Sequence, residues 1–113
     1  MVRGNPAFST GLPEMLILRL LKEREMYGYE IVQAIRAGTQ DALAPGEGVV
    51  YPLLHALEKQ GLLKARRRMA EGRSRIYYAL TARGARRLEG LAGDWTRMAE
   101  AVRAMLKGPA HAV

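Results

Sequence analysis

Apolar residues in the first part of the chain recur at the spacing of helices that face a core. A first helix is predicted after Thr10 and Gly11, with Pro13 in its first turn. It is apolar on nearly every side, through Leu12, Met15, Leu16, Ile17, Leu18, Leu20 and Leu21. A helix with so little polar surface must be covered on more than one face, so we expect contacts from its own domain and from a second chain.

Two more helices are predicted, over roughly 27–37 and 48–60, and glycine follows each of them at Gly38 and Gly61. Their apolar faces consist of Tyr27, Ile31 and Ile35 in one helix and of Val50, Leu53, Leu54 and Leu57 in the other. A short loop with Pro45 and Gly46 separates the two helices. This arrangement is typical of a helix-turn-helix.

After Gly61 the period of the pattern changes from 3.6 residues to two, which predicts strands. Apolar and basic positions alternate through Leu63, Lys64, Ala65, Arg66, Arg67, Arg68 and Met69, and again through Arg75, Ile76, Tyr77, Tyr78, Ala79 and Leu80. A turn over 70–74 joins the two strands. The pattern therefore predicts a β-hairpin with a basic face and a basic tip.

A last helix is predicted from a cap at Thr81 to about Lys107. Its apolar residues are spaced alternately by three and four, namely Leu88, Leu91, Trp95, Met98, Val102 and Met105. This is the a/d seam of a coiled coil, although packing against its own domain would give the same pattern. A helix of about 26 residues is about 39 Å long and would project from so small a domain, which favours a second copy as its partner.

Together these elements predict a mainly α (α+β) fold, a winged helix-turn-helix of order α-α-α-β-β followed by a long C-terminal dimerisation helix. The expected division is a flexible arm over 1–9, the winged helix-turn-helix over 10–80, the dimerisation helix over 81–107 and a tail over 108–113. A chain of 113 residues has room for one such core.

Positive charge is concentrated in one segment. Residues 64–87 hold nine basic residues and one acidic residue, a net charge of +8, whereas the rest of the chain holds nine basic and ten acidic residues. The bias suits a polyanion such as DNA, RNA or an anionic membrane surface.

Other classes of protein find little support. The chain has no cysteine and two histidines, and it shows no phosphate-binding glycine loop and no paired-carboxylate motif, so we expect no enzyme, metal or cofactor. Its longest apolar run is too short to cross a bilayer, and no export signal is recognisable. We therefore expect a cytoplasmic protein without a membrane partner.

In a winged helix-turn-helix, the third helix reads base edges in the major groove and the basic hairpin contacts phosphates. The predicted contacts with double-stranded DNA are Tyr29, Gly48, Val49, Tyr51, Pro52, His55, Lys59, Arg66, Arg68, Arg73 and Arg75. For two of these residues a role other than DNA contact is open. His55 could be a plain surface residue, and Tyr51 could be a structural tyrosine between helix and hairpin.

Three segments of the chain carry a recognisable pattern, namely YPLLHALEKQGLL at 51–63, YGYEI at 27–31, and YYALT at 77–81 with Gly84 after it. Together they resemble the PadR family of transcriptional regulators. They occur in the family's order and spacing, and the resemblance covers roughly 10–107. It implies a homodimeric repressor on a palindromic operator, similar to short members with a single C-terminal helix. Val49 departs from the family, in which Ser or Thr is usual, so operator details do not carry over.

The resemblance also implies a possible ligand. In some multidrug-sensing members, a tryptophan in the equivalent helix lines a pore between the subunits. Trp95, with Met15 and Met98, is thus a candidate platform for a small planar aromatic effector, the alternative being that Trp95 is core. The alternative function is a winged helix that binds RNA or another protein and responds to no effector.

Overall fold

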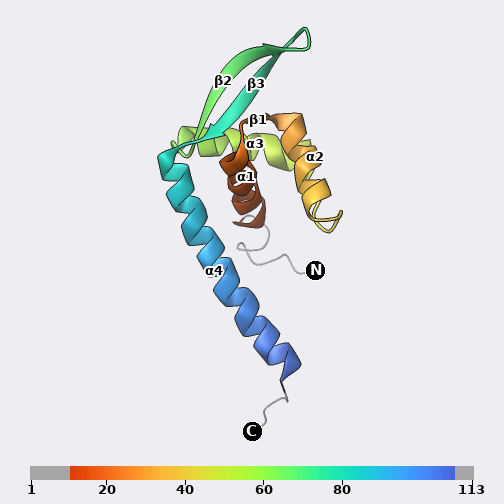
Figure 1. Ribbon diagram of the computed structural model, residues 1–113, viewed down its shortest axis with the longest axis vertical. Coiled ribbons are helices and arrows are strands. Elements are labelled where there is room, and N and C mark those ends of the chain that lie inside the picture. The colour runs from red at the N-terminus through yellow and green to blue at the C-terminus, as the bar shows by residue number, and fades with distance from the viewer. Residues whose placement is uncertain (1–10, 109–113) are drawn as a thin grey trace.

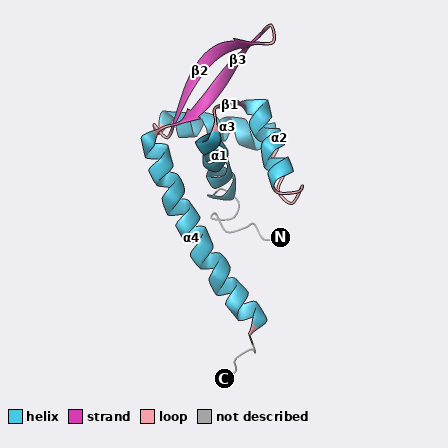
Figure 2. Ribbon diagram, viewed as in Figure 1, coloured by secondary structure: helices cyan, strands magenta, loops and turns pink. Residues whose placement is uncertain are grey.

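The computed structural model describes residues 11–108, which form four helices and a small antiparallel sheet (Figures 1 and 2). The predicted arm over 1–9, Thr10 and the part of the tail after Gly108 lie outside the described residues. The elements are α1 (Leu12–Glu23), β1 (Met26–Tyr27), α2 (Gly28–Gly38), α3 (Glu47–Lys59), β2 (Leu63–Ala70), β3 (Arg73–Leu80) and α4 (Ala82–Lys107). The predicted winged helix-turn-helix with a long last helix is confirmed.

The three helices α1, α2 and α3 enclose one apolar core beneath the sheet. Its fully buried side chains come from each of these helices, and they are Ile17, Leu18, Ile31, Val50, Leu54 and Leu57. Leu63 of β2 and Tyr78 of β3 close the core from above. The apolar stripes predicted for the second and third helices therefore meet as expected, apart from Leu53 and Tyr27, which are half-buried.

The sheet has the order β1-β3-β2, and β1 was not predicted. Met26 and Tyr27 pair with Tyr78 and Tyr77 of β3, so the residue taken for the start of the second helix belongs to a strand. Two residues are too few to show a period of two, which is why the pattern gave no sign of this strand. Its pairing joins the end of α1 to the β-hairpin.

The β-hairpin, called the wing from here on, consists of β2 and β3 over 63–80 and reaches well beyond the helices (Figure 1). Its turn is tighter than predicted, since Ala70 and Arg73 are still paired and only Glu71 and Gly72 lie between the strands. Both turn residues have positive φ, +53° and +75°, as a two-residue turn that follows the twist of the strands requires.

The start of helix α4 packs against the turn that follows α3. The Thr81 hydroxyl accepts from the Gly84 amide at 3.0 Å and donates to the carbonyl of Gly61 at 2.8 Å, so the predicted cap is confirmed. Gly84 itself is buried against the carbonyl of Leu62. Further along, α4 leaves the domain, and its second half extends past the other helices (Figure 1).

We predict that Gly84→Ala destabilises the protein. A Cβ at this position would lie 2.2 Å from the Leu62 carbonyl oxygen, a backbone atom that cannot move aside. Urea unfolding should show a loss of about 1–3 kcal/mol in the free energy of unfolding. The control is Gly90→Ala in the same helix, where nothing lies within 4 Å; there a gain of about 0.5–1 kcal/mol is expected. Equal gains at both positions would contradict the close contact.

Candidate nucleic-acid interface

One face of α3 is free of internal packing. Because Val50, Leu54 and Leu57 are buried, the residues on the opposite side of the helix point away from the core. The predicted contacts of this helix are all exposed, namely Gly48, Val49, Tyr51, Pro52, His55 and Lys59. Val49 is 48% exposed and lines a shallow apolar depression together with Leu12 and Leu16 of α1. Tyr29, in the first turn of α2, is also exposed.

A groove of about 260 Å³ separates α3 from the wing. Its walls come from β1, the start of α2, α3 and β3, and they comprise Tyr27, Gly28, Tyr51, Leu54, His55, Arg75, Ile76 and Tyr78. Tyr51 packs so closely on Gly28 that a Cβ there would lie 2.6 Å from its ring, yet the side chain is 38% exposed. It is thus a structural tyrosine with an accessible edge. Partial burial and the nearby Glu47 raise the pKa of Tyr51, so the hydroxyl remains a neutral donor.

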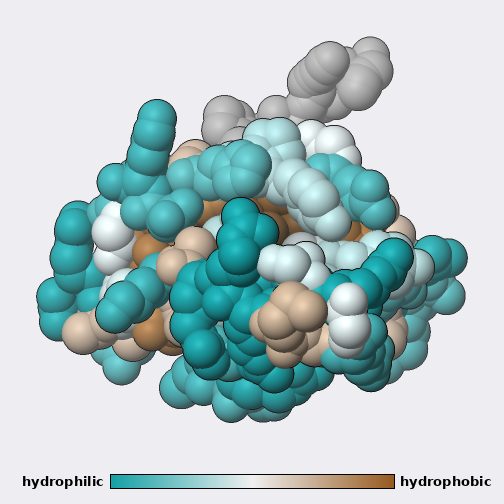
Figure 3. All heavy atoms as spheres, turned by 90° about the horizontal axis from the view of Figure 1, so that it is seen from above, coloured by the Kyte–Doolittle hydropathy of each residue, from teal (hydrophilic) through white to brown (hydrophobic). Residues whose placement is uncertain are grey.

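The two faces of the wing differ in what they contact. Side chains on a strand alternate between faces, and the register places Arg67 opposite Ile76 on the face toward α3. Arg66 and Arg68 lie on the other face, opposite Tyr77 and Arg75. Seen from above, the molecule is covered mostly by hydrophilic residues, with smaller apolar patches between them (Figure 3).

Three of the four predicted wing arginines have partners within the protein. Arg66 and Arg68 both bind the carboxylate of Glu25. Arg75 lies 4.3 Å from the centre of the Tyr27 ring, and its side chain is 18% exposed. Arg73, at the turn, is exposed. Tyr77 also lies on this outer face, where the alternating pattern predicts an exposed residue. It is nevertheless buried, because the Tyr27 ring and the Arg68 guanidinium cover it.

Sequence reasoning missed Arg67. Strict alternation put it on the core side with Leu63 and Ala65, and this is the side it occupies. The core ends before Arg67, however, so its side chain is exposed beside the groove and donates to the Ser74 hydroxyl at 3.2 Å. The length of the strands was the available signal, because eight residues extend farther than the core beneath them.

The apolar stripe of α4 divides into two parts. Leu88 is buried in the domain core and Leu91 packs partly against it, so the upper part of the predicted seam is covered by its own chain. Arg87 adds an ion pair to Glu14 of α1 at 2.8 Å, and this hydrogen bond raises the pKa of Arg87. The upper part of α4 is thereby attached to α1.

The lower part of the stripe lies open along a groove of about 460 Å³. Trp95, Met98 and Val102 line it, together with Ala99, Arg103, Leu106 and Lys107. Met105, which was predicted to belong to this stripe, is 80% exposed and does not line the groove. Leu106 lines it instead. A straight helix has 3.6 residues per turn, whereas the predicted seam assumes a repeat of 3.5 residues. Residues chosen with that repeat therefore move gradually away from one face of the helix. Met15 packs against the domain core and is not among the lining residues.

Within the described range 11–108, the structure brings together no group of three potential metal ligands among His, Cys, Asp and Glu. No helix in this part of the chain is both long and apolar enough to cross a membrane.

A helix-turn-helix with an exposed third helix, a basic wing and a projecting last helix defines a winged-helix transcriptional regulator. Comparison with known families agrees with this class, since residues 17–90 match the transcriptional regulator PadR-like family. The match covers well over half of the chain, and the chain belongs to this family, whose members are transcriptional regulators and not enzymes.

Relatives extend the similarity to nearly the whole chain. The transcriptional regulator Rv3488 of Mycobacterium tuberculosis is 29% identical over 104 residues, which is 92% of each protein. The transcriptional regulator YqjI of Escherichia coli is 38% identical over 73% of this chain, but the match spans 38% of that longer protein. A PadR family regulator from Clostridium difficile is 28% identical with a TM-score of 0.75, over 85% of this chain and 99% of that structure.

We predict that Gly48→Ala separates folding from DNA contact. In the free protein nothing lies within 4 Å of the added Cβ, and alanine favours a helix, so stability should rise by about 0.5–1 kcal/mol. If the backbone at Gly48 approaches a base pair closely, operator affinity should fall despite this gain. Gly90→Ala is the matched control, since it adds the same methyl group to a helix far from α3. Unchanged affinity in both variants would show that the DNA does not approach Gly48.

Proposed function

We propose that this protein is a sequence-specific DNA-binding regulator that inserts α3 into the major groove and sets its wing against the flanking backbone. The observation that supports this best is the exposed face of α3, which runs into a groove bordered by wing residues. A duplex lying on α3 would meet the wing on the side that carries Arg67, and Arg66 and Arg68 would reach flanking phosphates from the other face of the wing. PadR-type regulators bind DNA, which gives the proposal its setting.

The contacts fall into two kinds. Base readout is assigned to Gly48, Val49, Tyr51, Pro52 and His55, near the start and middle of α3, where Val49 could meet a thymine methyl group. Phosphate contacts are assigned to Tyr29, Lys59, Arg66, Arg67, Arg68, Arg73 and Arg75. Arg67 and Arg73 are the first candidates, since within 11–108 neither has an ion pair or a ring contact, whereas Arg66, Arg68 and Arg75 must leave or share such a partner.

A homodimer would cover the open part of α4. The groove beside Trp95, Met98 and Val102 is apolar and lies on a helix that projects from its domain. The half-buried Leu16 and Leu20 of α1 line a further depression. This depression would accept the contact from a second chain that the apolar sequence of α1 predicts. Two-fold symmetry would then present two α3 helices to a palindromic operator, with half-sites about one turn of DNA apart. Repression needs only that the bound dimer covers promoter DNA.

A small effector would occupy the part of the α4 groove that the dimer does not fill. Trp95 is 38% exposed beside the groove, and Met98 lines the same space, so a small planar aromatic molecule would find a ring to stack on and a side chain that adapts to its shape. Release from DNA would require that such a compound bind the DNA-free arrangement more tightly, and bound DNA would weaken the compound by the same factor.

We predict that removing Arg67 or Arg73 weakens binding to all duplexes alike. Each alanine variant should make the log–log salt dependence shallower by about one per lost phosphate contact in each protomer. Val49→Ala or His55→Ala should instead reduce operator affinity selectively, by about 1–3 kcal/mol for a true base contact. Fluorescence anisotropy with operator and random duplexes measures both effects. Stronger binding to an RNA competitor, or no DNA binding at all, would favour the RNA-binding or protein-binding alternative.

We predict that Val102→Glu produces a folded monomer. Val102 is 49% exposed and stands outside the domain core, so the charge would disturb a dimer and leave the fold intact. Thr96→Glu serves as the control, because it places the same charge on an exposed part of α4 that does not line the groove. Sedimentation should give a monomer for the first variant and a dimer for the second. A dimeric Val102→Glu protein would place the interface elsewhere.

A further inference from the structure

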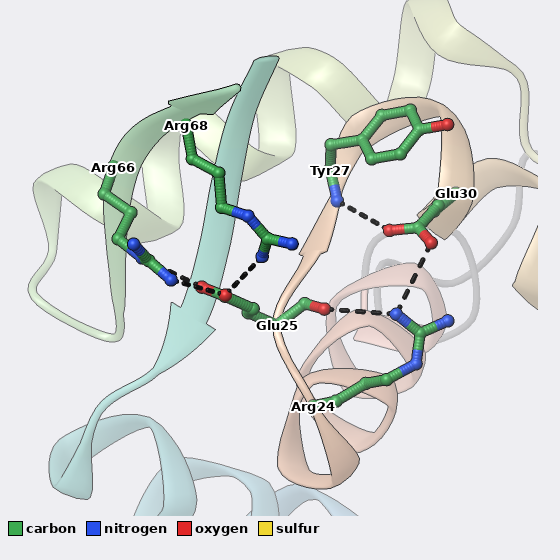
Figure 4. Close-up of polar contacts among 6 residues, drawn as sticks. All are labelled: Arg24, Glu25, Tyr27, Glu30, Arg66 and Arg68. Carbon is green, nitrogen blue, oxygen red and sulfur yellow. Dashed lines mark hydrogen bonds and ion pairs between the residues drawn. The ribbon is translucent and has the colours of Figure 1, made fainter. Parts of the chain in front are cut away.

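Glu25 lies in the loop between α1 and β1 and binds two wing arginines at once (Figure 4). One carboxylate oxygen accepts from Arg66 Nε at 3.1 Å, and the other accepts from Arg66 Nη2 and Arg68 Nη1, both at 2.6 Å. The two arginines come from β2, and their guanidinium groups reach over β3 to meet the acid. This cluster ties the far strand of the wing to the loop before β1.

The carboxylate presents to these arginines the geometry that a DNA phosphate would present. Two oxygens of one anion accept paired N–H groups from Arg66, which is how arginine binds carboxylates and phosphates alike. The hydrogen bond with Arg66 lowers the pKa of Glu25, so the acid stays ionised at neutral pH. With the acid in place, the three side chains carry a net charge of +1 instead of +2.

The cluster is also accessible enough to exchange partners. The side chains of Arg66 and Arg68 are 61% and 38% exposed, and that of Glu25 is 25% exposed. Ion pairs at such positions contribute little to stability, because water screens them. A phosphate arriving at the wing can therefore replace the carboxylate without unfolding anything.

We propose that Glu25 is an internal competitor of DNA phosphates, which holds Arg66 and Arg68 in the free protein and limits how strongly the wing binds DNA of any sequence. Sequence-independent affinity grows with the number of phosphates that a protein neutralises. With a net charge of +8 over 64–87, this term would otherwise favour the vast excess of non-operator DNA. The proposal rests on the proposed function, since it concerns the same wing.

The test is Glu25→Gln with a random-sequence duplex, so that no operator need be known. The extra positive charge should tighten binding about fivefold at 0.15 M salt, and the log–log salt slope should become steeper by about one per protomer. Glu25→Ala, which also removes the hydrogen bonds, should do the same. Glu100→Gln makes the same change of charge on an exposed position of α4 and should leave the affinity unchanged.

A double-mutant cycle locates the effect. With Arg66→Gln and Arg68→Gln already present, Glu25→Gln should no longer change the affinity. If the wild-type protein binds the duplex but Glu25→Gln binds no more tightly, the competitor role is wrong and the proposed function stands. Weaker binding would instead make Glu25 a positioning residue for Arg66 and Arg68, which also overturns the proposal. A wild-type protein that binds no DNA would defeat the proposed function itself.

Discussion

The contact between Gly84 and the carbonyl of Leu62 determines how the functional parts of this molecule are placed. The same carbonyl accepts from the backbone amide of Thr81 at 3.2 Å, and it lies 3.0 Å from the Thr81 hydroxyl, which shares its one hydrogen between this carbonyl and that of Gly61. The end of α3, the start of β2, the end of β3 and the start of α4 therefore meet at one point. Any side chain at position 84 would separate them. The end of the helix proposed to read DNA and the start of the helix proposed to hold the dimer are thus held together at this point, although the whole wing lies between them in the sequence.

This joint has a mechanical consequence for regulation. Below it, Leu88 is buried in the core and Arg87 is paired with Glu14, so the upper part of α4 moves with α1 and the rest of the domain. From Trp95 onward the groove on α4 is lined by residues of this helix alone, and the second half of the helix extends past the rest of the domain. A change in how two copies cross there would rotate each domain as a unit and so reset the distance between the two α3 helices. Communication would then need no change inside the domain.

Much of this could be predicted from the sequence, because the elements are long and their patterns are regular. The cap at Thr81, the end of α4 at Lys107 and the exposed face of α3 follow from local preferences and from a period of 3.6 residues. The two-residue strand β1 could not be predicted, since its pairing with Tyr77 and Tyr78 is a contact between distant residues. For the same reason the partners of Arg66 and Arg68 were hidden, because Glu25 precedes them by about forty residues.

The wing shows why a charge count alone misjudges an interface. A charge count treats all the arginines of 63–80 as equal, but in the fold they differ in which acidic or aromatic side chains they contact. Arg75 covers Tyr27 and Arg68 covers Tyr77, so these two guanidinium groups also act as apolar cover for aromatic rings. Arg67 and Arg73 have exposed side chains toward α3 and at the turn. The positive charge that the wing leaves unpaired is therefore set by register and by one acid outside the wing, and it is smaller than the sequence alone suggests.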